Sequence, residues 1–192
     1  MSPCGADAIF RERVTTQLMP DDQSLNAWAR TLPPAAADVV ARSDLAHPHV
    51  HMRFPATPAQ VGVARAQVTE WTRRLGLPTV HGQDIVLATD EAISNAVEHA
   101  YPGDSGTLTL FAARIQPDHA VRIIVSDEGE WRPPPENPGF RGRGLVMMER
   151  LAEVFELAHT PLGTTVVLGW PATPDSRADD SDLAVPWATH DQ

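Results

Sequence analysis

The order of helical and β-strand patterns between residues 48 and 171 is the feature that most limits how this chain can fold. A short alternating run precedes two long helical patterns, and two β-rich runs, a short helix and a hairpin follow. The predicted elements are a strand at residues 49–54, helices at 58–75 and 80–100, strands at 106–115 and 121–126, a helix at 144–152, and a hairpin of residues 154–158 and 164–170. This order predicts an α+β fold, an α/β sandwich in which a mixed sheet carries helices on one face.

Both ends of the chain differ from this central domain, so the sequence divides into residues 1–47, 48–171 and 172–192. The N-terminal extension has a weak helical periodicity that prolines interrupt, at Phe10, Val14, Leu18, Leu25, Trp28 and Leu32. This pattern leaves open whether the extension packs on the domain or stays mobile. The last 21 residues hold five aspartates and one arginine, which predicts an acidic, disordered tail.

The composition narrows the class of protein. A net charge of −10 argues against direct nucleic-acid binding, because phosphate neutralisation by Lys and Arg supplies most of that affinity. No apolar run approaches the ~18 residues of a membrane-spanning helix, and the N-terminus lacks a secretory signal. The single cysteine, Cys4, excludes an internal disulfide and a Cys-rich zinc site. We therefore expect a cytoplasmic protein that binds neither membranes nor nucleic acid.

Glu91 and Asn95 lie one helical turn apart in the second long helix, and His99 extends the same stripe. The Asn95 amide oxygen could ligate Mg²⁺, a hard ion that takes few protein oxygens and keeps several waters. The Glu91 carboxylate could accept the proton of an attacking hydroxyl group. The alternative is an ordinary solvated helix face, which is favoured when this spacing is considered alone.

Three glycine-containing segments follow along the chain. At the end of a strand, Asp127 could accept a hydrogen bond from the amine of adenine, and Gly129 would let the backbone approach a flat ring. Gly142 and Gly144 precede a helix, where backbone N–H groups can converge on phosphate oxygens. Thr164 heads the last strand. Taken singly, the first segment is better interpreted as a turn that ends a strand, and the third as a plain hairpin turn. The second is interpreted equally well as a flexible loop entering a helix.

Their order, however, resembles that of the GHKL ATPase superfamily, which includes histidine-kinase catalytic domains, gyrase and Hsp90-type chaperones. The chain resembles more closely the anti-sigma-factor serine/threonine kinases of the SpoIIAB and RsbW type. The segments that carry the resemblance are Glu91-Ala-Ile-Ser-Asn95-Ala-Val-Glu-His99-Ala-Tyr101, Asp127-Glu-Gly129, Gly142-Arg-Gly144-Leu145 and Gly163-Thr164-Thr165. A proline-rich segment, Trp131-Arg132-Pro133-Pro134, resembles the short lid of the actinobacterial branch, although Trp131 stands where the superfamily often has a glycine.

The resemblance implies a Bergerat-type ATP-binding fold that uses ATP and Mg²⁺. It implies that Asn95 holds Mg²⁺, that Glu91 is the catalytic base, and that Asp127 recognises the adenine amine. Gly129 would line the adenine pocket, and Thr164 would help to fix adenine through a water. The remaining nucleotide-binding positions that it implies are His99, Gly142, Arg143, Gly144 and Leu145, with the glycines wrapping the phosphates.

The function that follows is a protein serine/threonine kinase. It would phosphorylate a serine of a STAS-type anti-anti-sigma protein and sequester a sigma factor, and the resemblance suggests a homodimer. A second hypothesis is nucleotide-gated protein binding without phosphotransfer. A detached histidine-kinase catalytic half is a weaker third, and an ATP hydrolase is disfavoured because gyrases and chaperones of this superfamily carry large additional domains.

A competing metal site must also be considered. His47, His49 and His51 alternate and would share one face of a strand, which is compatible with zinc. We find no neighbouring carboxylate or cysteine to complete such a site. Solvent-facing histidines of an edge strand are therefore the preferred interpretation.

Overall fold

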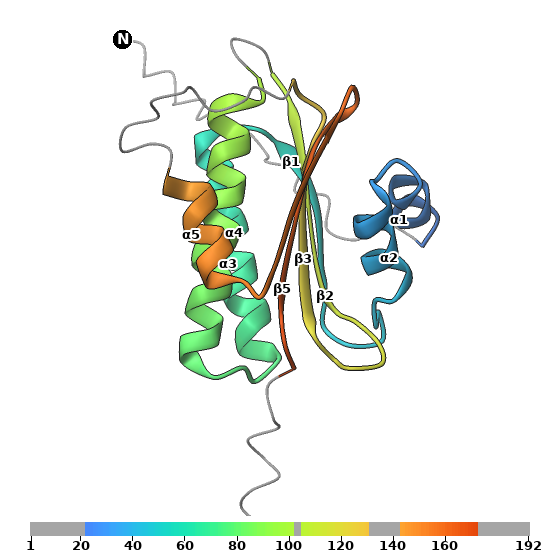
Figure 1. The fold of residues 1–192 in the computed structure, drawn as a ribbon, viewed down its shortest axis with the longest axis vertical. Helices are drawn as coiled ribbons and strands as arrows, with labels where there is room; N and C mark the ends of the chain where they lie inside the picture. Colours follow the sequence, from blue (N-terminus) through green and yellow to red (C-terminus); the bar gives the residue numbers. More distant parts are fainter. Residues whose placement is uncertain (1–21, 102–104, 131–142, 173–192) are drawn as a thin grey trace, which may run out of the picture.

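The computed structural model describes residues 22–101, 105–130 and 143–172. Figure 1 shows a central sheet with helices on both sides. The helices are α1 (Asp22–Ala29), α2 (Pro34–Ala41), α3 (Pro58–Arg74), α4 (Thr79–His99) and α5 (Arg143–Leu151). The strands are β1 (Val50–Pro55), β2 (Thr107–Arg114), β3 (Val121–Asp127), β4 (Val154–Thr160) and β5 (Gly163–Trp170). The predicted elements of the central domain are confirmed, with bounds that shift by a few residues.

The sheet has the order β1-β2-β3-β5-β4, and every neighbouring pair is antiparallel. The α/β sandwich is confirmed, but the prediction of a mixed sheet is wrong. Two helices, α3 and α4, join β1 to β2. The chain therefore enters β2 at the same end of the sheet at which β1 ended, and the two strands are antiparallel. A single helix joins β3 to β4, which makes these strands parallel, but β5 lies between them and pairs with both.

One face of the sheet packs against α3, α4 and α5. Alternate strand residues point to this face and form the larger core, with Leu110, Ile123 and Leu168 fully buried against Val68 and Ile93 of the helices. Gly76, with a φ of +66°, ends the α3 segment before α4 begins. Packing of α4 against the sheet and against α3 fixes the position of this helix, which carries Glu91 and Asn95.

The opposite face is also covered, so the prediction of helices on one face is wrong. Phe111, Ile124 and Val167 point away from α4 and are buried beneath α1 and α2, as the blue helices in Figure 1 show. The physical reason is that β2, β3 and β5 are apolar on both faces, and a face of this kind needs a second layer. Leu25 is buried in that layer, and Trp28 and Leu32 pack against it. Phe10, Val14 and Leu18 lie outside the described residues.

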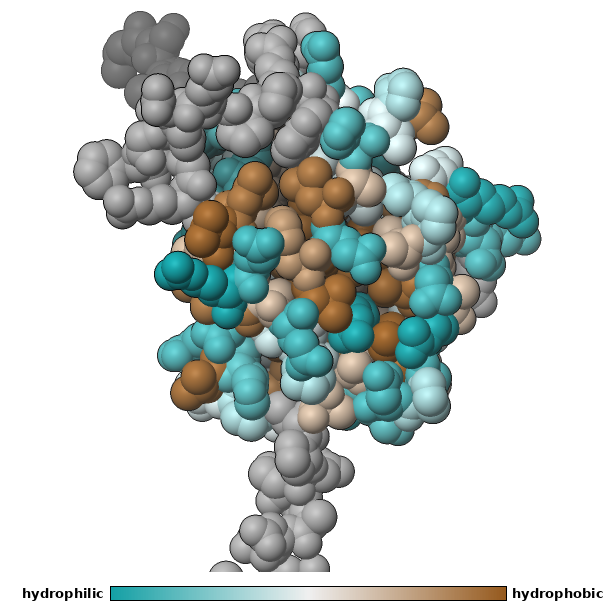
Figure 2. Space-filling model, in the orientation of Figure 1, coloured by the Kyte–Doolittle hydropathy of each residue, from teal (hydrophilic) through white to brown (hydrophobic). Residues whose placement is uncertain are grey.

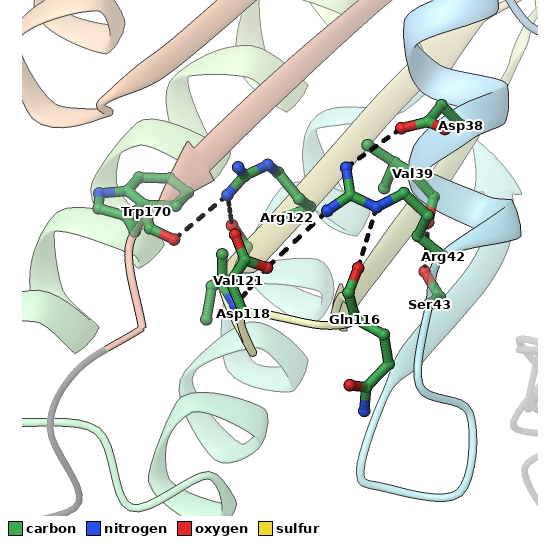
Figure 3. A network of polar contacts seen from close by, with 10 residues as sticks. Asp38, Val39, Arg42, Ser43, Gln116, Asp118, Val121, Arg122 and Trp170 are labelled. Carbon is green, nitrogen blue, oxygen red and sulfur yellow. Dashed lines mark hydrogen bonds and ion pairs between the residues drawn. The ribbon is translucent and has the colours of Figure 1, made fainter.

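A network of polar contacts fixes the end of α2 to the hairpin between β2 and β3 (Figure 3). The Arg42 guanidinium donates from Nε to the Gln116 carbonyl at 2.9 Å and lies 3.4 Å from the Asp38 carboxylate. Backbone hydrogen bonds continue this attachment, with Asp44 N donating to Arg114 O and Gln116 N donating to Arg42 O, both at 2.8 Å. The second layer is therefore attached by backbone pairing as well as by apolar burial.

Strand β4 forms one edge of the sheet, and its apolar side chains are only partly covered. Phe155 and Leu157 are half-buried against the core, whereas Val146 on α5 and Leu162 at the hairpin tip are exposed. Figure 2 shows apolar side chains interspersed with polar ones over α5 and the strands beside it. Among the described residues, no helix has the length and apolar character needed to cross a bilayer.

The three alternating histidines do not converge. His47 contacts the Asp44 carboxylate at 2.8 Å, a partner that the sequence interpretation missed, and His49 Nδ1 lies 3.1 Å from the His47 carbonyl. The His51 ring instead packs on the second layer, with its centroid 5.3 Å from that of Trp28 and 5.9 Å from that of Phe111. No group of three or more potential metal-binding side chains occurs within the described ranges.

Acidification is expected to destabilise the folded protein through His51. Burial, and secondarily the charge of His49, lowers the pKa of His51 from 6.5 to about 4. The unfolded chain therefore binds this proton at a higher pH, and the free energy of unfolding falls as the pH drops from about 6.5 towards 4. The full shift corresponds to at most about 3 kcal/mol, and partial solvent contact reduces this value.

Urea unfolding at about pH 7.5 and about pH 5 measures this effect, with His51→Phe as the comparison. The variant keeps an aromatic ring beside Trp28 but has no proton to bind. We expect it to lose less stability on acidification than the natural protein. Equal losses in the two proteins would show that His51 does not titrate in this way.

Candidate functional site

The α4 helix presents Glu91 and Asn95 on the side that meets α5. Both side chains are half-buried, while the apolar face of the helix, including Ile85, Ala92 and Ile93, is buried in the larger core. The start of α5 approaches closely: a Cβ atom at Gly144 would overlap the Glu91 carboxylate and would lie 3.1 Å from Asn95 Nδ2. The fold thus brings together a carboxylate, an amide and a glycine from segments about fifty residues apart in the sequence.

Next to Glu91, the carboxylate of Asp90 has a different partner. Arg65 of α3 donates to it twice, from Nε and from Nη2, each at 2.8 Å. This bidentate pair ties α3 to α4 and orients the helix about its axis. Of the two adjacent carboxylates, Asp90 is committed to α3 and Glu91 is the one that faces α5. No local pattern in the sequence predicts this role of Asp90.

Asp127 is the buried carboxylate of the site, at the end of β3, and its side chain is almost fully removed from solvent. Its Oδ1 atom accepts hydrogen bonds from Gly129 N at 2.9 Å and from Thr164 N at 3.1 Å. Burial raises the pKa of Asp127, and these two backbone hydrogen bonds oppose that rise. None of the described residues donates to Oδ2, which leaves that oxygen for a further donor.

The loop that follows Asp127 touches the end of α4. Glu130 N donates to the Ala100 carbonyl at 3.1 Å, and a Cβ atom at Gly129 would overlap that carbonyl. Only five residues separate Ala100 from Asn95, which is about 7.5 Å along a helix axis. The Glu91–Asn95 group and the Asp127 group therefore belong to one end of the molecule, joined by the last turn of α4.

The other predicted site residues differ in how much of them the structure describes. Leu145 is half-buried against the larger core, and His99 is exposed, with Nε2 3.9 Å from the Glu98 carboxylate. Arg143 begins α5, and its side chain is not described. Gly142, Trp131 and the proline-rich segment lie outside the described residues.

Tyr101 was included in the motif without a role, and the structure shows that it has several contacts. It lies immediately beyond α4, donates through its hydroxyl to Thr107 O, and accepts a hydrogen bond from Glu128 N, both at 2.7 Å. A sequence signal was available, because Tyr101 ends the motif that contains Glu91 and Asn95. Its hydrogen-bond partners are distant in sequence, so the motif alone could not name them.

The chemistry of these groups fits a magnesium nucleotide. Glu91 and Asn95 offer carboxylate and amide oxygens, and Mg²⁺ takes a few such oxygens and completes its shell with phosphate and water. Asp127 offers a buried acceptor of the kind that an aromatic amine can satisfy. Gly144, which has no side chain, lets the start of α5 approach the Glu91 carboxylate closely, and helix N-termini favour phosphate.

Comparison with known proteins supports this interpretation. Residues 54–170 match the family described as the histidine kinase-like ATPase domain. The chain is 37% identical over 83 residues to the serine-protein kinase RsbW of Oceanobacillus iheyensis, covering 43% of this chain and 51% of that protein. It is 32% identical over 82 residues to the serine-protein kinase RsbW of Bacillus subtilis, with coverage of 43% and 51%. It thus spans about half the length of the curated relatives that it matches.

A solved structure extends the likeness to three dimensions. The crystal structure of the RsbU and RsbW domains of a Mycobacterium tuberculosis protein is 35% identical and aligns with a TM-score of 0.53. The alignment covers 64% of this chain and 32% of that one. This match supports the α/β sandwich independently of the contacts described above.

Substitution of Gly144 by alanine is expected to weaken Mg-ATP binding by about fivefold, because relief of over-packing costs about 1 kcal/mol where the neighbour can move. The new methyl group would take the position of the Glu91 carboxylate and turn this flexible side chain away from the start of α5. Isothermal titration calorimetry measures the change. Gly62→Ala is the matched control, because no atom lies within 4 Å of a Cβ at that position on α3.

The control should bind Mg-ATP normally and gain about 0.5–1 kcal/mol of stability from the better helix propensity of alanine. Unchanged affinity in Gly144→Ala would show that the approach of α5 to Glu91 has no part in nucleotide binding.

Proposed function

The chain belongs to the family of histidine kinase-like ATPase domains, and from this membership we propose that it is an ATP-dependent serine/threonine protein kinase of the RsbW type. It would phosphorylate a STAS-type anti-anti-sigma protein and bind a sigma factor, in the cytoplasm and as a homodimer. The observation that carries this proposal is the convergence of Glu91, Asn95 and Gly144 beside the buried Asp127.

The residues would divide the nucleotide between them. Asp127 Oδ2 accepts a hydrogen bond from the adenine amine, while Gly129 and Thr164 hold the other carboxylate oxygen in place. Asn95 contributes an amide oxygen to Mg²⁺, which neutralises charge on the phosphates. The start of α5, at Gly144, faces the phosphates with its backbone N–H groups. Residues Gly142, Arg143, Leu145 and His99 complete this proposed site.

Phosphotransfer would use Glu91 as the base. The hydroxyl oxygen of the partner's serine forms a bond to the γ-phosphorus, and the bond from that phosphorus to the β–γ bridging oxygen breaks. The electron pair of the broken bond leaves with ADP, and the serine proton passes to Glu91. Because the Asp90 carboxylate already accepts two hydrogen bonds from Arg65, Glu91 is the carboxylate of this helical turn that remains to accept the proton.

Glu91→Gln should keep Mg-ATP binding and reduce phosphotransfer by about 10²–10⁴-fold, the usual contribution of a general base. The assay is transfer of labelled γ-phosphate to a STAS protein, with affinity measured separately by calorimetry. Glu98→Gln is the matched control, because Glu98 is an exposed carboxylate of the same helix. Normal transfer by Glu91→Gln would remove this residue from the chemistry.

Asp127→Asn should weaken ATP binding by at least about tenfold, because a charged hydrogen-bond acceptor contributes roughly 1.5–3 kcal/mol. Circular dichroism must show a native fold, since the Asp127 carboxylate also holds two backbone N–H groups. Asp118→Asn, at the opposite end of the sheet, is the control and should bind normally. Equal affinities for ATP in all three proteins would refute the adenine role.

The alternative function is nucleotide-gated binding of a protein partner without transfer. The same assay separates the two, because the kinase transfers labelled phosphate to serine of the STAS protein. Complex formation that depends on ATP, with no label on the partner, would favour the alternative. Acid-labile label on a histidine would instead indicate the catalytic half of a histidine kinase.

A further inference from the structure

Tyr101 connects three segments that meet at the end of α4. Its hydroxyl donates to the carbonyl of Thr107, the first residue of β2, and accepts from the N–H group of Glu128, each at 2.7 Å. Its ring fills the space over Gly106, where a Cβ atom would overlap it. A tyrosine hydroxyl has one hydrogen to donate, so Tyr101 is oriented by a donor on one side and an acceptor on the other.

The phenol remains a donor at neutral pH. Burial raises the pKa of Tyr101, and the negative charges of Asp127 and Glu128 raise it further, while its backbone hydrogen bonds oppose this change. Tyr101 contacts the backbone N–H of Glu128, the residue directly after Asp127.

The adjacent backbone makes a second connection between the same segments. The Ala100 carbonyl accepts from Glu130 N, and Gly129 lies against it. Glu128 N and Glu130 N are therefore both held by consecutive residues at the end of α4. Between them, Gly129 N donates to Asp127 Oδ1, so the turn that aims this carboxylate is fixed at each of its three N–H groups.

We propose that Tyr101 is a positioning residue for adenine selection: by holding Glu128 N it sets the direction in which Asp127 Oδ2 faces the adenine amine. This inference rests on the proposed function, because it concerns how a bound purine is distinguished. It goes further by assigning purine specificity to a residue that does not itself touch the nucleotide. Tyr101 would link the helix that carries Glu91 and Asn95 to the loop that recognises the base.

The test compares ATP with inosine triphosphate, which has a carbonyl in place of the adenine amine. The natural protein should prefer ATP, because inosine triphosphate has an acceptor oxygen at the position where the adenine amine would donate to Asp127. Tyr101→Phe removes the hydroxyl and keeps the ring, and it should lower the ratio of ATP to inosine triphosphate affinity by about tenfold. The inosine triphosphate affinity should stay within about twofold. A general loss of structure would instead weaken both nucleotides together.

A double-mutant cycle shows whether Tyr101 acts through Asp127. In an Asp127→Asn background, Tyr101→Phe should have no further effect on the ratio, and independent, additive effects would overturn the proposal. Ser43→Ala is the control, because it removes a hydroxyl that donates to a backbone carbonyl, that of Val39, far from the site. Its nucleotide ratio should equal that of the natural protein.

Two measurements keep the proposal testable if Tyr101→Phe fails to fold. Gly106→Ala displaces the Tyr101 ring without changing the residue, and it should lower the same ratio. In the natural protein, the Glu128 amide should exchange its hydrogen slowly. Exchange at the rate of a solvent-exposed amide would refute the hydrogen bond from Glu128 N to the Tyr101 hydroxyl on which the proposal rests. Failure of the natural protein to bind ATP would refute the proposed function instead, whereas a preserved ratio in Tyr101→Phe would refute only this inference.

Discussion

The close approach of the α4 end to the loop after β3 is the contact on which the rest of the site depends. Helix α4 carries Glu91 and Asn95 and strand β3 carries Asp127, so neither element alone holds all of the proposed site residues. The Ala100 carbonyl and the Tyr101 hydroxyl join the two by accepting from Glu130 N and Glu128 N. These contacts pair main-chain groups of the two segments, including the carbonyl of the buried Ala100.

A sheet buried on both faces supports this joint. The larger core sets α4 against β3, and the smaller core, beneath α1 and α2, removes the outer face of the same strands from solvent. Strands β2 and β3 are therefore held from both sides, and the loop that ends β3 starts from a rigid element. The polar attachment of Arg42 to the β2–β3 hairpin holds the opposite end of these strands. The positions of the side chains at the site thus depend on packing in both cores, away from the site itself.

Local patterns in the sequence predicted the elements well and their spatial arrangement less well. The spacing of Glu91 and Asn95 places them on one helical face, and the Asp127-Glu-Gly129 segment ends a strand, as expected. The antiparallel pairing could not be predicted from local patterns, because the position of β5 between β3 and β4 depends on contacts between residues far apart in the sequence. Leu25 and Trp28 have the right period for a packed helix, but only the apolar outer face of β2, β3 and β5 shows what they cover. The contact of Gly144 with Glu91 likewise depends on how α5 docks, which no local pattern contains.

The glycines at the site have a consequence for interpreting related chains. Gly106, Gly129, Gly144 and Gly163 each lie where a side chain would collide with Tyr101, Ala100, Glu91 or the Asp127 backbone. Gly129 and Gly163 meet backbone atoms, so these two are required by the way the backbone closes, whether or not a phosphoryl group is ever transferred. A descendant that has become a pseudoenzyme could therefore retain Gly129 and Gly163 while losing the carboxylate of Glu91, and Gly144 would then be free to change as well. Retention of the first two glycines indicates the fold, whereas Glu91 and Gly144 together indicate the chemistry.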